Sequence, residues 1–156
     1  MTEDPTQGNE ISEIDESDPD CLFCKIVAGE IPAEVVARDA RVTAFLDVQP
    51  LADGHVLVVP TAHAACIEDL TPADADVLFR TVTRLAGPVR TALGAAGTTI
   101  GINNGEATGQ TIPHVHVHIV PRWPGDGGGS IHSSFQMGKR RPLPDVGAAI
   151  RRVTGG

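Results

Sequence analysis

Apolar and polar residues alternate along the middle of residues 112–120, which read IPHVHVHIV. Successive side chains of a strand point to opposite faces, so this pattern predicts a β-strand over 112–120 with apolar side chains on its buried face. The other face then carries His114, His116 and His118, with neighbouring side chains roughly 6.5–7 Å apart. Adjacent imidazoles at that spacing can share one small anionic group, so this strand is the first candidate for chemistry.

Four other short runs also have the composition of β-strands. They are rich in β-branched and apolar residues and are bounded by turn residues. They cover residues 34–38, 42–46, 55–59 and 98–103. Together with the histidine strand they predict an antiparallel sheet of about five strands.

A longer periodic stretch predicts one long helix between Thr71 and Gly94. Thr71 can cap it, Pro72 suits its first position, and apolar residues recur every three or four positions. Pro88 lies inside the stretch and is expected to kink or shorten the helix. A short N-terminal helix is expected near Cys24. The predicted fold class is therefore α+β, with the long helix packed on one face of the sheet.

The formal net charge of −8 is unevenly distributed along the 156 residues. Residues 1–20 contain eight acids and no Lys or Arg, whereas residues 21–156 contain twelve acids and twelve Lys or Arg. A segment this polar cannot bury enough apolar surface to fold, so residues 1–20 are predicted to be a disordered acidic tail. Residues 21–122 form the predicted domain, and residues 123–156 a glycine-rich C-terminal loop and tail.

The sequence also limits the expected location and partners. The N-terminus has no basic region followed by an apolar run, so it does not resemble a signal peptide, and no long apolar segment predicts a transmembrane helix. The predicted domain has no basic patch with which to neutralise a phosphate backbone. We therefore expect a cytoplasmic protein with neither a membrane nor a nucleic acid polymer as its partner.

A polar loop with glycines leads directly into the histidine strand. Asn103 ends the preceding predicted strand, and the loop finishes with Gly109, Gln110 and Thr111. Small residues allow backbone N–H groups to converge on an anion, and the side chains of Gln110 and Thr111 add further donors. The loop is therefore expected to bind a phosphate group.

Two kinds of chemistry fit the three histidines. Neutral imidazole is a common metal ligand, so the three side chains can share a catalytic zinc or iron ion. Alternatively, the middle residue, His116, attacks phosphorus as a nucleophile while its neighbours donate to the phosphoryl oxygens. No Asp or Glu lies within the strand to complete a mixed metal site, and the preceding loop favours the nucleophile.

Cys21 and Cys24 form a CxxC motif at the start of the predicted domain. Such a pair is a redox centre or half of a zinc site, unless both thiols are simply buried. Two further ligands are needed to complete a zinc site, and His63 and His114 are candidates.

The loop and the histidine strand together resemble a known family. Gly-Gln-Thr is followed after two residues by His-Val-His-Val-His-Ile-Val, and every position from His114 to Val120 matches the signature of the histidine-triad (HIT) family. The resemblance covers residues 21–122, and it implies a HIT-type fold and a homodimer. It also implies a purine nucleotide substrate, from which AMP or GMP is released through a nucleotidyl-histidine intermediate.

The resemblance further implies which residues catalyse the reaction. His116 is the expected nucleophile, and His118 and His55 are expected to support the phosphate. The third triad histidine is present as His118, where the transferase and phosphorylase branches carry Gln, so hydrolysis is favoured. The expected substrates are phosphoramidates, acyl-adenylates and dinucleoside polyphosphates. The acid that protonates the leaving group stays open between His118 and Thr111.

Nucleotide-binding residues also follow from the resemblance. The apolar residues expected around the base are Phe23, Ile26, Ile31, Phe45 and Val48. Asp47 is expected to bind the ribose hydroxyls, since a carboxylate can accept two hydrogen bonds at once. The residues expected at the phosphate are Asn103, Gly109, Gln110 and Thr111.

A metal site is implied as well, because similar bacterial HIT proteins hold a structural zinc ion. Their ligands match Cys21, Cys24, His63 and His114 in this chain. A closed Cys2His2 tetrahedron has no open position, so this Zn²⁺ is expected to be structural. An alternative of a different class is a nucleotide-binding regulatory or interaction module with incidental turnover.

Overall fold

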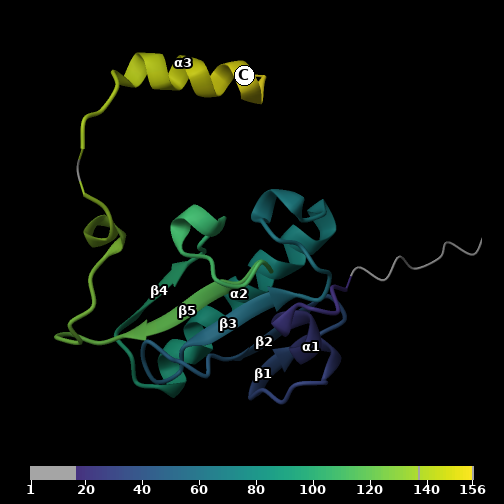
Figure 1. Cartoon of the computed structure of the whole chain (residues 1–156). Coiled ribbons are helices and arrows are strands. Elements are labelled where there is room, and N and C mark those ends of the chain that lie inside the picture. The colour runs from purple at the N-terminus through teal and green to yellow at the C-terminus, as the bar shows by residue number, and fades with distance from the viewer. Residues whose placement is uncertain (1–16, 137, 156) are drawn as a thin grey trace, which may run out of the picture. The chain divides into compact units, whose positions relative to one another are not determined.

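The computed structural model describes residues 17–136 and 138–155 of the chain (Figure 1). The chain divides into two compact units, Met1–Asp126 and Gly127–Gly156. Most of the predicted acidic tail, residues 1–16, lies outside the described residues. Among the described residues, no helix is both long and apolar enough to cross a membrane.

Five antiparallel strands form the sheet of the first unit, in the order β1-β2-β3-β5-β4. The strands are β1 (Val35–Arg38), β2 (Val42–Leu46), β3 (Val56–Pro60), β4 (Gly97–Gly101) and β5 (Val117–Arg122). The predicted α+β class and the five-stranded antiparallel sheet are therefore confirmed. β4 ends at Gly101, whereas the sequence predicted that this strand reaches residue 103.

The helices also largely follow the prediction. They are α1 (Leu22–Ala28), α2 (Pro72–Ala92) and α3 (Leu143–Thr154), and 3₁₀ turns cover Ile67–Asp69, Glu106–Thr108 and Ile131–Ser134. Thr71 caps α2, because its hydroxyl oxygen accepts a hydrogen bond from the backbone N–H of Asp74 at 3.2 Å. Pro88 was expected to kink or shorten the helix, but α2 is not shortened, because it continues through Pro88 to Ala92.

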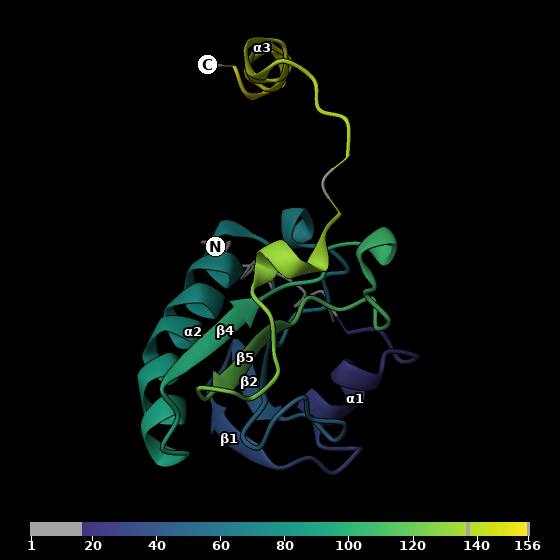
Figure 2. The ribbon, with the colours of Figure 1, turned by 90° about the vertical axis from the view of Figure 1, so that its left-hand side faces the viewer.

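Helices cover both faces of the central strands of the sheet (Figure 2). On one face, Leu78 of α2 packs in a buried cluster with Val58 of β3. On the opposite face, Phe23 of α1 packs in a second cluster with Leu57. Alternate residues of β3 thus enter different cores, which explains why this strand is apolar throughout.

The segment before β5 bends where the sequence predicted a continuous strand. β5 begins at Val117 rather than at residue 112. Pro113 has no N–H to donate to a neighbouring strand. The backbone N–H of His114 donates to the carbonyl of Ile112 at 2.8 Å, and that of Val115 donates to Ala64 at 2.7 Å. His114 therefore lies in a bend before the strand.

The second unit contains α3, where the sequence predicted only loops and a tail. That prediction is wrong for residues 143–154. Leu143, Val146, Ile150 and Val153 recur at helical spacing, and this pattern was the available signal. The pattern extends over a short stretch that also contains Gly147, so it is weak beside the glycine-rich segment before it.

Candidate active site and metal centre

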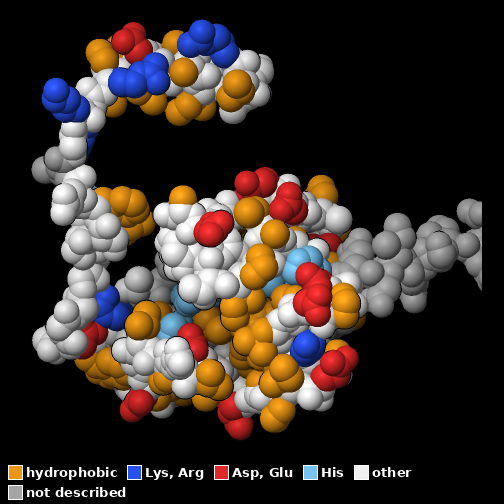
Figure 3. Space-filling view, in the orientation of Figure 1, with side chains coloured by type: hydrophobic (Ala, Val, Ile, Leu, Met, Phe, Trp, Pro, Cys, Tyr) orange, Lys and Arg blue, Asp and Glu red, His pale blue; other side chains and the backbone are white. Residues whose placement is uncertain are grey.

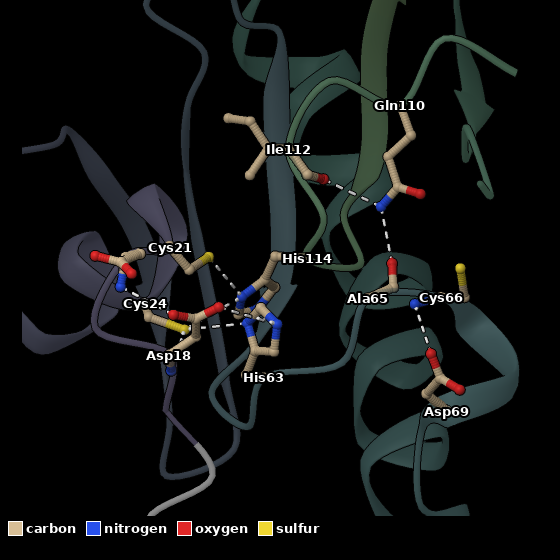
Figure 4. Close-up of polar contacts among 11 residues, drawn as sticks. Asp18, Cys21, Cys24, His63, Ala65, Cys66, Asp69, Gln110, Ile112 and His114 are labelled. Atoms are coloured by element: carbon tan, nitrogen blue, oxygen red, sulfur yellow. Dashed lines mark hydrogen bonds and ion pairs between the residues drawn. The ribbon is translucent and has the colours of Figure 1, made fainter. Parts of the chain in front are cut away.

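Cys21, Cys24, His63 and His114 come together beside the N-terminal end of α1 (Figure 4). Their ligand atoms all lie within 4.8 Å of one another. Cys21 Sγ is 3.5 Å from His114 Nδ1, and Cys24 Sγ is 3.4 Å from His63 Nδ1. The sequence predicted these four residues as ligands of one metal ion, and their side chains form a group that can bind one.

The second ring nitrogen of each histidine in this group faces an oxygen. His114 Nε2 donates to the carbonyl of Pro60 at 2.9 Å, and His63 Nε2 lies 3.8 Å from the carboxylate of Asp18. Such oxygens fix the ring of a metal-bound histidine and leave the lone pair of the other nitrogen for the ion. The two thiols and the two oriented imidazoles therefore fit a tetrahedral Zn²⁺.

Asp18 also contacts this group, although the sequence predicted that it lies in the disordered tail. Its backbone N–H donates to Cys24 Sγ at 3.4 Å, in addition to the contact between its carboxylate and His63. The folded part therefore begins before residue 21. Asp18 lies three residues before the CxxC motif, but it is one of eight acids in residues 1–20, and nothing in the sequence distinguished it from the others.

Burial shapes the protonation of the cluster. It lowers the pKa of His114 to about 4, so this imidazole is neutral and able to bind a metal at neutral pH. Burial also raises the pKa of the Cys24 thiol. A thiolate at Cys24 is therefore unfavourable unless a cation compensates its charge, as Zn²⁺ does when it is bound.

A cavity of about 410 Å³ is lined by α1, β2, β3 and the histidine segment. Its lining includes all of the apolar residues predicted around a base: Phe23, Ile26, Ile31, Phe45 and Val48. Asp47, Thr111, His116 and His118 contribute polar groups to the same cavity. Histidine side chains are visible among hydrophobic ones on one face of the first unit (Figure 3). The size and the mixed lining suit a small ligand.

His116 is held in one tautomer by the backbone. Its Nδ1 donates to the carbonyl of His114 at 2.7 Å, so the lone pair resides on Nε2. The ring of Phe23 packs edge-on against it, with the centroids 5.1 Å apart and the planes at 79°. This fixed imidazole has the form of a nucleophile.

His118 lies beside His116 and contacts a further histidine. The ring centroids of His116 and His118 are 4.9 Å apart. On its other side, His118 Nδ1 is 2.9 Å from Nε2 of His55, which is 2% exposed and is not among the residues that line the cavity. Burial lowers the pKa of His118 to about 4, so its imidazole is neutral at pH 7.

The loop expected to cradle a phosphate is braced by the side chain of Gln110. Its Nε2 donates to the carbonyls of Ala65 at 2.8 Å and Ile112 at 3.1 Å (Figure 4). These donors therefore hold the loop against neighbouring backbone. Thr111 lines the cavity. The predicted phosphate residues outside its lining are Asn103, Gly109 and Gln110.

The three triad histidines do not share one metal site. Within the part of the chain that the structure describes, His114 belongs to the cysteine group, and His118 belongs to a second group of possible ligands with Asp47 and His55. His116 belongs to neither group. The alternative of one catalytic ion held by all three is therefore contradicted, because the bend before β5 brings His114 to the thiols.

Comparison with known proteins shows relatives along most of the chain. The family model described as the HIT domain matches residues 28–125. An uncharacterized HIT-like protein of Methanocaldococcus jannaschii is 46% identical over 107 residues, which are 69% of this chain and 82% of the relative. An adenosine 5'-monophosphoramidase of Schizosaccharomyces pombe is 41% identical over 105 residues, covering 65% and 74%. An adenylylsulfatase of Arabidopsis thaliana is 36% identical over 103 residues, and the match spans only 52% of its length.

Solved structures agree with these sequence relatives. A HIT family member from Bacillus subtilis has a TM-score of 0.76 at 34% identity, covering 85% of this chain and 96% of that one. A Zn-bound histidine triad family protein from Mycobacterium smegmatis has a TM-score of 0.66 at 31% identity, covering 87% and 96%.

Proposed function

The chain belongs to the HIT family, and we propose that it hydrolyses purine nucleotides by transferring a nucleoside monophosphate first to His116 and then to water. The observation that carries this proposal is the hydrogen bond from His116 Nδ1 to the carbonyl of His114. It leaves a lone pair on Nε2 of a histidine that lines a cavity with both apolar and polar side chains. The activities named for the two enzymes among the relatives support the same class of reaction.

In the first step, His116 Nε2 attacks the α-phosphorus, the N–P bond forms and the bond to the leaving group breaks. In the second step, water attacks the same phosphorus and gives up a proton, the N–P bond breaks, and AMP or GMP is released as the neutral imidazole returns. Thr111 and His118 line the cavity beside His116, so their donors can stabilise charge on the phosphoryl oxygens. The proposed leaving groups are an amine, a carboxylate, sulfate or a second nucleotide.

The rest of the nucleotide fits the remainder of the cavity. Phe23 and Phe45 lie with their rings 5.6 Å apart at 68° and offer apolar surface for a base. Asp47 lies at the same cavity and can accept hydrogen bonds from the two ribose hydroxyls.

We further propose that one Zn²⁺ per chain ties the N-terminal segment to the histidine segment. Cys21 directly precedes α1, and Cys24 lies in its first turn. His63 follows β3, and His114 precedes β5. An ion held by all four would connect these segments without an open position for substrate. A homodimer in the cytoplasm remains our expectation from the family resemblance.

The covalent intermediate gives the sharpest test. Rapid quench of the protein with adenosine 5'-phosphoramidate, followed by intact-mass analysis at neutral or alkaline pH, should reveal an adenylyl group on His116. His116→Gly should lower the hydrolysis rate by several powers of ten, while AMP affinity falls far less, since the remaining lining still holds the nucleotide. The matched control is His132→Gly, which removes an exposed histidine of the second unit.

Two outcomes would reject this mechanism. One is inversion at a chiral phosphorothioate, because two successive in-line displacements give net retention. The other is a His116→Gly variant that keeps more than about a tenth of the wild-type rate. AMP binding without any adduct or turnover would support the nucleotide-binding module instead.

A further inference from the structure

The side-chain amide of Gln110 has no donor to spare for a ligand. Its Nε2 carries two protons, which it donates to the carbonyls of Ala65 at 2.8 Å and Ile112 at 3.1 Å (Figure 4). Its Oε1 accepts a hydrogen bond of 2.7 Å from the backbone N–H of Gly105. The sequence predicted that this side chain donates to a bound phosphate, but both of its donors already bind the protein's own backbone.

The three bonds of Gln110 fix the backbone on both sides of it. The bond from Gly105 closes the start of the loop, and the bond to Ile112 spans Thr111, which lines the cavity. Among the described residues, the backbone N–H groups of Thr111 and Ile112 make no hydrogen bond. Such groups are available to an anion. Gln110 therefore holds in place the part of the loop that presents donors at the cavity.

A neighbouring carbonyl holds the proposed nucleophile in a similar way. The backbone N–H of Val115 donates to the carbonyl of Ala64 at 2.7 Å. That N–H belongs to the same peptide group as the carbonyl of His114, which accepts the Nδ1 proton of His116 at 2.7 Å. Two successive carbonyls of one segment therefore hold the ring of His116 and, through a side chain, the loop.

We propose that Gln110 is a positioning residue, which sets the separation between the donors of the loop and the attacking Nε2 of His116. The inference deepens the proposed function and rests on it for the identity of the reaction. Gly105 and Gly109 have positive φ values of 96° and 92°, which glycine adopts without steric cost, so the loop backbone has little stiffness of its own. A displacement of about 1 Å between reacting groups can lower a rate by about 10²-fold.

Asn104 offers a matched comparison, because it ties the same loop to the same segment. Its Oδ1 accepts the backbone N–H of Ile67 at 2.8 Å, and its Nδ2 donates to the carboxylate of Glu68 at 2.8 Å. These bonds secure the start of the loop, but they do not reach Thr111 or Ile112. Removing them should therefore destabilise the fold without displacing the donors at the cavity.

Backbone nitrogen-15 NMR relaxation of the zinc-loaded full-length protein measures the order of the loop without any substrate. In the wild type, residues 110–112 should have order parameters of about 0.85, as in rigid backbone. Gln110→Met keeps a side chain of similar length without the amide, so these values should fall below about 0.6. Asn104→Leu should leave them unchanged. Residues 110–112 that stay as rigid in Gln110→Met as in the wild type would overturn the proposal.

Kinetics should separate positioning from overall stability. Gln110→Met should lower kcat for adenosine 5'-phosphoramidate by about 10²-fold, with a much smaller change in KM, because the apolar part of the cavity is intact. Asn104→Leu should stay within about threefold of the wild-type kcat, although its melting temperature falls as far as that of Gln110→Met. Equal losses of kcat in the two variants, or no loss in Gln110→Met, would contradict a positioning role.

A second substitution keeps the test open if Gln110→Met does not fold. Gln110→Asn retains the amide on a stem that is one methylene shorter, so its kcat and its order parameters should lie between those of Gln110→Met and the wild type. Wild-type values of both in Gln110→Asn would reject the proposal. Because the relaxation data need no substrate, absence of hydrolysis by the wild type would count against the proposed function alone.

Discussion

The two groups of histidines in this chain use the same side chain in opposite ways. In the cysteine group, His63 and His114 direct one nitrogen to a carboxylate or a carbonyl and the other to a thiol, so both nitrogens are committed. In the cavity, the pairing of His116 and His118 leaves one nitrogen of each ring free for a ligand. In each group, the partners of the ring nitrogens determine whether one nitrogen is left available to a ligand.

The bend before β5 is what separates the two groups. His114 and His116 are two residues apart, yet one joins the buried thiols and the other lines the cavity. The carbonyl of His114 fixes the ring of His116, so the proposed metal ligand and the proposed nucleophile are adjacent parts of one segment. A change at the metal centre is therefore expected to affect the cavity, but only through the position of the backbone.

The largest expected effect comes from removing a committed ligand. Cys24→Ala should abolish stoichiometric Zn²⁺ binding and lower the melting temperature by about 10 °C or more, because a structural zinc site contributes folding energy directly. Elemental analysis and thermal unfolding measure both effects. Cys66→Ala is the control, since Cys66 is a free cysteine outside the group. Wild-type protein without zinc, when prepared without chelator, would refute the metal site.

A second, smaller effect should come from the residue behind the ligands. Deleting residues 2–20, or replacing Asp18 by Ala, should weaken zinc binding by about 10- to 100-fold, as the loss of an outer-shell carboxylate usually does. Deleting residues 2–16 leaves Asp18 in place and should change neither zinc affinity nor, beyond about twofold, hydrolysis. Competition with a chromophoric chelator measures the affinities. Equal zinc affinity in the two deletions would remove Asp18 from the site.

Part of the fold and of the candidate site could be predicted from the sequence. β3 was located because both of its faces are buried, which leaves a continuous apolar run, and β2 was located because it is rich in apolar and β-branched residues. His63 and His114 were candidate partners of Cys21 by residue type, but the family resemblance was needed to imply the full ligand set, since the residues lie far apart in sequence. Their approach depends on how α1 packs against the sheet, which no local pattern reports.

Other features were missed because they depend on backbone partners. Alternation placed all three triad histidines on one face, but Pro113 and the bond from Val115 to Ala64 interrupt the strand. His55 was expected to support the phosphate, but it lies outside the cavity lining. Its side chain contacts His118 and the backbone N–H of Leu51 instead. Neither of these backbone contacts has a recognisable pattern in the sequence, in contrast to the helix cap at Thr71.

The smallest expected effect concerns the titration of His118 and the influence of the Asp47 carboxylate on it. NMR titration of the His118 ring should give a midpoint near pH 4, because burial and the neighbouring imidazoles lower its pKa while Asp47 raises it. The folded pKa lies below the ordinary value of 6.5, so His118 contributes stability above pH 6.5 that is lost as the pH falls towards 4.

Asp47→Asn tests the source of that shift. It removes the influence that opposes burial, so the pKa values of both His118 and His55 should fall further. Asp53→Asn is the matched control, because Asp53 is an exposed acid of the same turn. The hydrogen bond from the backbone N–H of Leu51 to His55 Nδ1 should survive Asp47→Asn, since it does not involve the carboxylate. Unchanged titration of both rings in Asp47→Asn would show that the carboxylate does not oppose the effect of burial.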